Sequence, residues 1–158
     1  MICEPFETLA DVAPRPGALM GLDLGTATIG VAVSDAFQSV ATPLETVRRK
    51  KFGVDADRLL AIAENRSIVG MVLGLPLNMD GSEGPRCQST RAFARNLAAR
   101  TELPIAFWDE RLSTVAAERA LLEADTTRKR RGEVIDHVAA SYILQGALDR
   151  LNHLDRGT

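Results

Sequence analysis

The sequence has few residues of the kinds that build disulfide frameworks or zinc sites. Its two cysteines, Cys3 and Cys87, are too few for a disulfide framework and show no metal-ligand spacing. Its two histidines, His137 and His153, cannot build a His-rich zinc site, and no H-E-x-x-H pattern occurs. These absences exclude a disulfide-stapled secreted scaffold and the common zinc enzymes.

Long apolar runs and aromatic side chains are scarce as well. No apolar stretch approaches the roughly 20 residues that a membrane span needs. Residues 1–18 carry three acids and no basic start followed by an apolar run, so they do not form a secretory signal. We therefore expect a cytoplasmic protein with no membrane partner. Aromatic residues make up only 4%, so no base-stacking array separates RNA from DNA as a partner.

The composition that remains is that of one folded domain. The chain has 158 residues, of which 46% are hydrophobic and 25% charged, enough to bury a core without disulfides or a structural metal. Residues 1–18 end in Pro-Arg-Pro-Gly and are expected to form a flexible leader. We expect a single domain over residues 19–151 and a tail over 152–158.

Hydrophobic patterns predict the elements of that domain. Two β-branched runs, at 19–24 and 29–33, are separated by Gly-Thr-Ala-Thr and indicate a hairpin. A third strand is expected over 41–47, at an edge because of Pro43. Residues 68–75 indicate a buried central strand, and 104–108 a short one. Helices are expected over 55–65, 87–100, 113–123 and 133–151. The order predicts an α/β fold with a mixed five-stranded sheet and helices on both faces.

One carboxylate stands inside a predicted strand. Asp23 interrupts an otherwise apolar run, and an uncompensated carboxylate in a central strand is costly. A divalent cation would compensate it, as would hydrogen bonds from neighbouring backbone N–H groups. Because Gly21 and Gly25 flank Asp23 and permit close approach, we favour the functional interpretation.

Further acids stand at the ends of elements. Asp109 and Glu110 directly follow the strand at 104–108, and ligands of α/β sheets usually bind at this end. Adjacent residues of an extended chain point to opposite sides, so at most one faces a given site unless the chain turns. Asp136 lies in the first turn of the last predicted helix. Both positions are also compatible with stabilisation of a helix dipole.

Taken together, these acids indicate a hard-cation site. Carboxylates without a His or Cys cluster suit Mg²⁺ or Mn²⁺ rather than zinc. Two such ions about 3.5–4 Å apart activate water and stabilise the leaving oxygen in phosphodiester cleavage. Such a site requires a fold that joins the first strand, the end of the strand at 104–108 and the last helix.

Basic residues are concentrated in two short runs. The formal net charge is −2, yet eight of the 19 basic residues lie in residues 48–51 and 128–131, both in predicted loops. Isolated charge runs are usually solvated loops. The second run stands five residues before Asp136, which suits a phosphate backbone entering the site. Its members are Arg128, Lys129, Arg130 and Arg131.

A turn-rich loop follows the predicted central strand. Residues 76–85 include Asn78 and are dense in turn formers, so backbone N–H groups there could meet a phosphate. The loop has no Walker lysine and is not a P-loop. A plain connection between strand and helix explains its spacing equally well.

Four segments, in order, resemble the YqgF/RuvX family of Holliday-junction resolvase-like nucleases. They are GLDLGTATIGVAVSD at 21–35, GLPLNMDGSEGP at 74–85, WDERLST at 108–114 and DHVAASYIL at 136–144. The resemblance covers about residues 19–150. It implies an RNase H-like fold whose acids match Asp23, the Asp109–Glu110 pair and Asp136. It also implies maturation of the 5′ end of pre-16S ribosomal RNA, with Holliday junction cleavage as the alternative.

The resulting hypothesis is a nuclease that hydrolyses phosphodiesters with Mg²⁺ or Mn²⁺. Asp23, Asp109, Glu110 and Asp136 are the catalytic candidates, and Asp23, Glu110 and Asp136 the metal ligands. Arg111, Asn78 and the basic run at 128–131 are the expected nucleic-acid contacts. The expected partners are pre-rRNA or branched DNA and ribosomal particles, and the protein is expected to be a monomer or homodimer.

Two functions of other classes remain open from the sequence. Asp-x-Gly-Thr after a first strand also opens actin-like and sugar-kinase ATP folds, but those need two such domains. A non-catalytic module that binds ribosomal RNA is the other alternative. ATP binding would favour the first, and RNA binding that survives EDTA without cleavage would favour the second.

Overall fold

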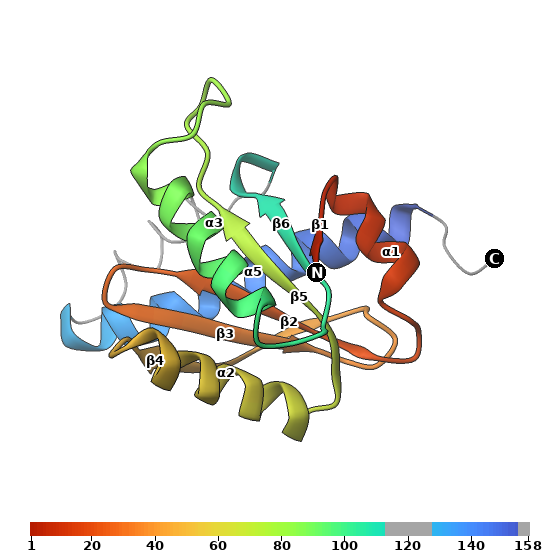
Figure 1. The fold of residues 1–158 in the computed structure, drawn as a ribbon, viewed down its shortest axis with the longest axis horizontal. Coiled ribbons are helices and arrows are strands. Elements are labelled where there is room, and N and C mark those ends of the chain that lie inside the picture. Colours follow the sequence, from red (N-terminus) through yellow and green to blue (C-terminus); the bar gives the residue numbers. More distant parts are fainter. Residues whose placement is uncertain (113–127, 155–158) are drawn as a thin grey trace.

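The protein folds around one mixed β-sheet (Figure 1). The computed structural model describes the backbone of residues 1–112 and 128–154, and the side chains of residues 1–112 and 137–154. The strands are β1 (Ile2–Cys3), β2 (Ala18–Leu24), β3 (Thr28–Ser34), β4 (Ala41–Arg48), β5 (Ile68–Leu75) and β6 (Ile105–Asp109). The helices are α1 (Leu9–Val12), α2 (Phe52–Asn65), α3 (Pro85–Ala98) and α5 (Arg128–His153), with 3-10 turns η1 (Phe6–Thr8) and η2 (Glu110–Leu112).

The strand order is β1-β6-β5-β2-β3-β4. Strands β2, β3 and β4 pair antiparallel, whereas β5 pairs parallel with β2 and β6, and β1 parallel with β6. Strand β4, which contains Pro43, lies at the edge, where a missing backbone donor is tolerated. The α/β fold class and the mixed sheet are thus confirmed, but the sheet has six strands rather than five.

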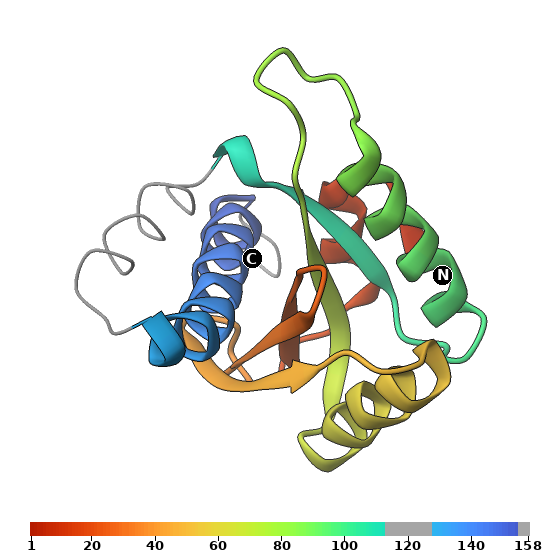
Figure 2. The same ribbon diagram turned by 90° about the vertical axis from the view of Figure 1, so that its left-hand side faces the viewer.

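Helices cover both faces of the sheet, as Figure 2 shows for α5 on one side and α2 and α3 on the other. Alternate residues of each strand supply the two cores. Met20, Leu22 and Leu73 belong to the core under α2 and α3. Val72 and Trp108 belong to the core under α5. Among the described helices, none is long and apolar enough to span a lipid bilayer.

The N-terminal segment is part of this folded unit. Strand β1 pairs with β6 at Ile105 and Ala106, and Leu9 is fully buried on the α5 side of the sheet. The expectation of a flexible leader was therefore wrong for residues 2–13. A two-residue strand and a one-turn helix are too short to leave a periodic pattern, and the polar residues of the segment obscured its few apolar contacts.

The last helix begins earlier than predicted. Helix α5 starts at Arg128 rather than near residue 133, so the basic run at 128–131 lies in helix and not in a loop. Arginine and lysine are good helix formers, and Gly132 weakens a helix by only about 1 kcal/mol relative to alanine. The helix predicted over 113–123 lies outside the residues that the structure describes.

Gly21 determines how closely α5 approaches the sheet. A Cβ at this position would lie 2.7 Å from Leu144 Cβ and 3.1 Å from the Ala140 carbonyl oxygen. We therefore expect Gly21→Ala to lower the free energy of unfolding by about 1–3 kcal/mol in urea titrations. Gly53→Ala in α2 is the control, because no atom lies within 4 Å of its added Cβ. Equal stability of Gly21→Ala and the unmodified protein would contradict this view of the contact.

Candidate active site

Asp23 lies near the end of β2, between β3 and β5 in the middle of the sheet. Its side chain is buried, with 7% of the residue exposed. Because strand residues alternate between faces, Asp23 shares a face with Gly21, which contacts α5 through Leu144 and Ala140. The carboxylate of Asp23 is therefore on the α5 face of the sheet.

Glu110 reaches the same face from the end of β6. A Cβ at Gly74 would lie 3.1 Å from Glu110 Oε1 and 2.6 Å from Ile143 Cδ1 of α5. The absence of a side chain at Gly74 thus leaves room for this carboxylate. In the β2–β5 ladder, Leu22 is paired with Leu73, so Asp23 and Gly74 follow side by side. Glu110 and Asp23 therefore both lie beside Gly74, on the same face and at the same end of the sheet.

Helix α5 passes this end of the sheet at the level of Asp23. Cross-strand pairing joins Asp23 to Gly30 and Gly30 to Thr46 in one row. At the end of that row, Thr46 Oγ1 lies 2.9 Å from His137 Nδ1 of α5. Asp136, next in the chain, is therefore in the turn of α5 at this level, although its side chain lies outside the described part.

Asp109 is engaged elsewhere. It continues the alternation of Ile105 and Phe107, which belong to the core under α3. Its carboxylate accepts hydrogen bonds from Arg111, at 2.7 Å from Nη2 to Oδ2 and 2.9 Å from the backbone N to Oδ1. These contacts hold the pKa of Asp109 below its ordinary value. Of the adjacent acids, Glu110 is the one beside Asp23.

The loop after β5 is tied to Arg111. Asn78 donates from Nδ2 to Ser82 Oγ at 3.0 Å, and Asp80 accepts from the Ser82 N–H at 2.9 Å. Arg111 Nη1 donates to the Met79 carbonyl at 3.3 Å. Asn78 therefore orders the turn at this loop, and Arg111 links the turn to the end of β6. The side chains of residues 128–131 are not among those described.

The two described carboxylates fit a divalent cation. Both Asp23 and Glu110 offer carboxylate oxygens, which are the donors that magnesium and manganese prefer. Within residues 1–112 and 137–154, no three His, Cys, Asp or Glu side chains form a metal-binding group. The third ligand expected from the sequence is Asp136, outside that search.

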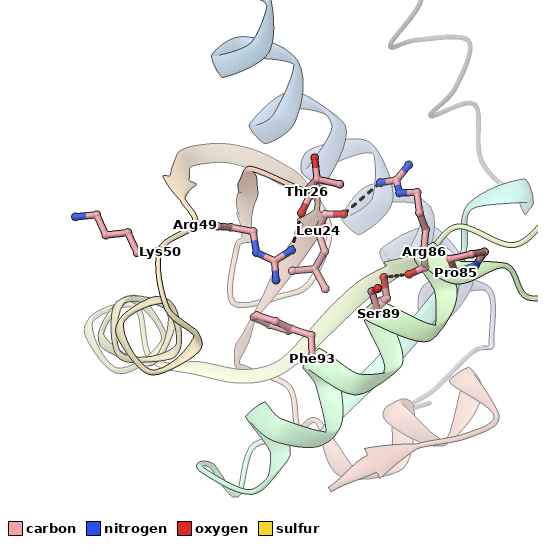
Figure 3. Close-up of a pocket in the computed structure, with 10 residues that line it drawn as sticks. Leu24, Thr26, Arg49, Lys50, Pro85, Arg86, Ser89 and Phe93 are labelled. Atoms are coloured by element: carbon pink, nitrogen blue, oxygen red, sulfur yellow. Dashed lines mark hydrogen bonds between the residues drawn. The ribbon is translucent and has the colours of Figure 1, made fainter.

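The first basic run, residues 48–51, lies at the same end of the sheet, on the side that α3 covers. Arg48 ends β4, and Arg49 and Lys50 line a cavity together with Arg86 at the start of α3 (Figure 3). No local pattern associates Arg86 with this run, because Arg86 follows Lys50 by 36 positions and both α2 and β5 lie between them. Gly74 was also missed as a site residue. A glycine inside an apolar strand is the signal for such a close approach.

Comparisons with known proteins agree on one family. The family model described as "RuvX: Holliday junction resolvase" matches residues 17–150. A Ruegeria pomeroyi protein named "Putative pre-16S rRNA nuclease" is 75% identical over 98% of this chain and 100% of its own length. A Paracoccus denitrificans protein of the same name is 71% identical over 99% of each chain.

The fold has relatives of known structure. T. thermophilus RuvC, solved in complex with a Holliday junction substrate, superposes with a TM-score of 0.54 at 13% identity, over 85% of this chain and 96% of RuvC. A second Thermus thermophilus RuvC structure gives a TM-score of 0.50 at 14% identity, over 85% of this chain and 96% of that chain. This likeness confirms the RNase H-like architecture. With the family match over residues 17–150 and relatives above 70% identity, the chain belongs to the RuvX family of nucleases.

Proposed function

We propose that the protein is a metal-dependent endonuclease whose centre is formed by Asp23, Glu110 and Asp136. The observation that carries this proposal is the approach of Glu110 to Gly74, beside Asp23, on the face that α5 covers. On this proposal, the carboxylates of Asp23 in β2 and Glu110 after β6, together with Asp136 in the turn of α5 at the same level, form the donor set of a hard cation.

The chain's own residues supply binding and orientation. Asp23 is fixed by its place in the central strand, and Glu110 by the turn after β6. Asp109 is a positioning residue that holds Arg111 against the 78–82 turn. On this proposal, Arg111, Asn78 and the basic residues 128–131 contact the phosphate backbone of the substrate. Bound Mg²⁺ or Mn²⁺ would lower the pKa of water and offset charge on the phosphate.

The substrate we propose is the 5′ leader of pre-16S ribosomal RNA. The support comes from the names of relatives at 67–75% identity. On this proposal the protein works in the cytoplasm, on RNA within ribosomal particles. Cleavage of Holliday junctions is the second candidate, favoured by the family description and the RuvC-like fold. Symmetric junction cleavage calls for a two-fold dimer, whereas trimming one RNA strand works with a monomer.

A side-by-side cleavage assay tests the proposal. The protein is incubated with a precursor-rRNA leader and with a four-way DNA junction, each with Mn²⁺, with Mg²⁺ and with EDTA. We expect metal-dependent cuts in the RNA leader and none in EDTA. Cleavage of the DNA junction alone would instead support the second candidate function, Holliday junction cleavage. Tight RNA binding in EDTA without any cleavage would replace the nuclease by a non-catalytic RNA-binding module.

A further inference from the structure

A cavity of about 480 Å³ opens beyond the end of β2, on the side of the sheet that α3 covers (Figure 3). Arg49 forms one wall from the segment after β4, and Arg86 forms the opposite wall from the first turn of α3. Thr26 and Ser89 add hydroxyl groups. A volume in this range accommodates a small ligand, such as one nucleotide unit.

The walls of this cavity carry charge of one sign. Three lining residues are cationic and none is a carboxylate. Arg49 Nη1 donates to the Gly25 carbonyl at 2.6 Å, and Arg86 Nη2 donates to the Leu24 carbonyl at 3.3 Å. Figure 3 shows both guanidinium groups converging on the turn after β2, while Lys50 extends away from it. The backbone thus holds two positive groups beside one opening.

Such an arrangement suits a phosphate group. A guanidinium has five N–H donors in a fixed fork that matches phosphate oxygens, and the carbonyl contacts use only one nitrogen of each side chain. The floor does not suit a stacked base, because Phe93 is 4% exposed and its ring already contacts both the Arg49 guanidinium and the Phe52 ring. The cavity therefore offers recognition of the backbone rather than of sequence.

Its position relates the cavity to the carboxylates. Leu24, whose carbonyl Arg86 contacts, directly follows Asp23, and the Gly25–Thr26 turn separates the cavity from the α5 face. We propose that this pocket binds a phosphate group of the nucleic-acid substrate, close to the point at which the nucleic-acid chain is cut. The inference rests on the proposed nuclease function and adds to it a second, metal-independent contact.

The test is a binding titration in EDTA, which removes any contribution of metal at the carboxylates. Fluorescence anisotropy follows a labelled single-stranded RNA oligonucleotide with a 5′-hydroxyl end. For the double variant Arg49→Ala/Arg86→Ala we expect about 10-fold weaker binding and a salt dependence whose slope falls by about 0.7, as for one lost phosphate contact. The matched control is Arg66→Ala/Arg95→Ala, which removes equal charge from exposed positions outside the cavity.

Two further arms sharpen the result. Ser89→Glu places a carboxylate at an exposed helix position on the rim and is expected to weaken binding without affecting folding. A 5′-phosphorylated oligonucleotide shows whether the pocket binds a terminal or an internal phosphate. If it binds a terminal phosphate, Arg49→Ala/Arg86→Ala weakens binding of the phosphorylated oligonucleotide more than binding of the 5′-hydroxyl form. If it binds an internal phosphate, the double variant weakens binding of both forms equally. Affinity reduced equally by the pocket and control variants, with no effect of Ser89→Glu, would overturn the proposal. This titration measures binding and not cleavage, so its result can be judged separately from the result of the nuclease assay.

Discussion

Asp23→Asn is expected to lower the rate of metal-dependent cleavage by at least about 1,000-fold while leaving the fold intact. Asparagine keeps the size of the side chain but removes the charge that a cation requires. The residue is 7% exposed within a central strand, so its position in the sheet is fixed by the surrounding backbone. The loss should appear in kcat, with the affinity for nucleic acid in EDTA unchanged.

Thermal unfolding with and without Mn²⁺ separates this role from a structural one. A cation that binds only the folded protein stabilises it by about 2.7 kcal/mol at 100 times its dissociation constant. The unmodified protein should therefore show a higher Tm in Mn²⁺, and Asp23→Asn should show little or no shift. Asp11→Asn, at an exposed position in α1, is the control and should keep both activity and the shift.

A purely structural role for Asp23 gives the opposite pattern. If its carboxylate served only to accept hydrogen bonds within the sheet, Asp23→Asn would unfold at lower temperature in EDTA and would retain much of its cleavage activity. Undiminished cleavage by a folded Asp23→Asn protein would remove this residue from the active site.

The sequence could predict the central part of the fold because burial leaves strong patterns there. Strand β5 is buried on both sides and has a continuous apolar run, and β2 and β3 are joined by a short turn. The edges were harder to predict. Strand β1 has only two residues, and its pairing with β6 joins positions about 100 residues apart. No local pattern carries such a contact.

The candidate site was predictable in its residue types but not in its arrangement. Asp23 stood out because a carboxylate within an apolar run demands compensation. The convergence of Arg49 and Arg86 depends on how α3 lies beside the turn after β2, which spacing along the chain does not specify. The same is true of His137 and Thr46, which meet only because α5 crosses β4.

The choice between Asp109 and Glu110 yields the second large prediction. Glu110→Gln should lower the rate of cleavage by about 100- to 1,000-fold, because its carboxylate lies over Gly74 beside Asp23. Asp109→Asn should cost less than about 10-fold, because its carboxylate is bound by Arg111 on the other side of the chain. The two substitutions are matched in chemistry and adjacent in sequence, so they serve as controls for each other.

Stability and pH distinguish the two acids further. The Asp109–Arg111 pair is partly exposed and screened by solvent, so its loss should lower the free energy of unfolding only slightly. Because Arg111 lowers the pKa of Asp109, this stabilisation is present at neutral pH and disappears as the pH falls through that lowered pKa. Urea titrations over a descending series of pH values should show the largest difference between Asp109→Asn and the unmodified protein at pH 7, and this difference should shrink as the pH falls through the lowered pKa of Asp109. A larger loss of cleavage in Asp109→Asn than in Glu110→Gln would instead assign the metal-facing role to Asp109.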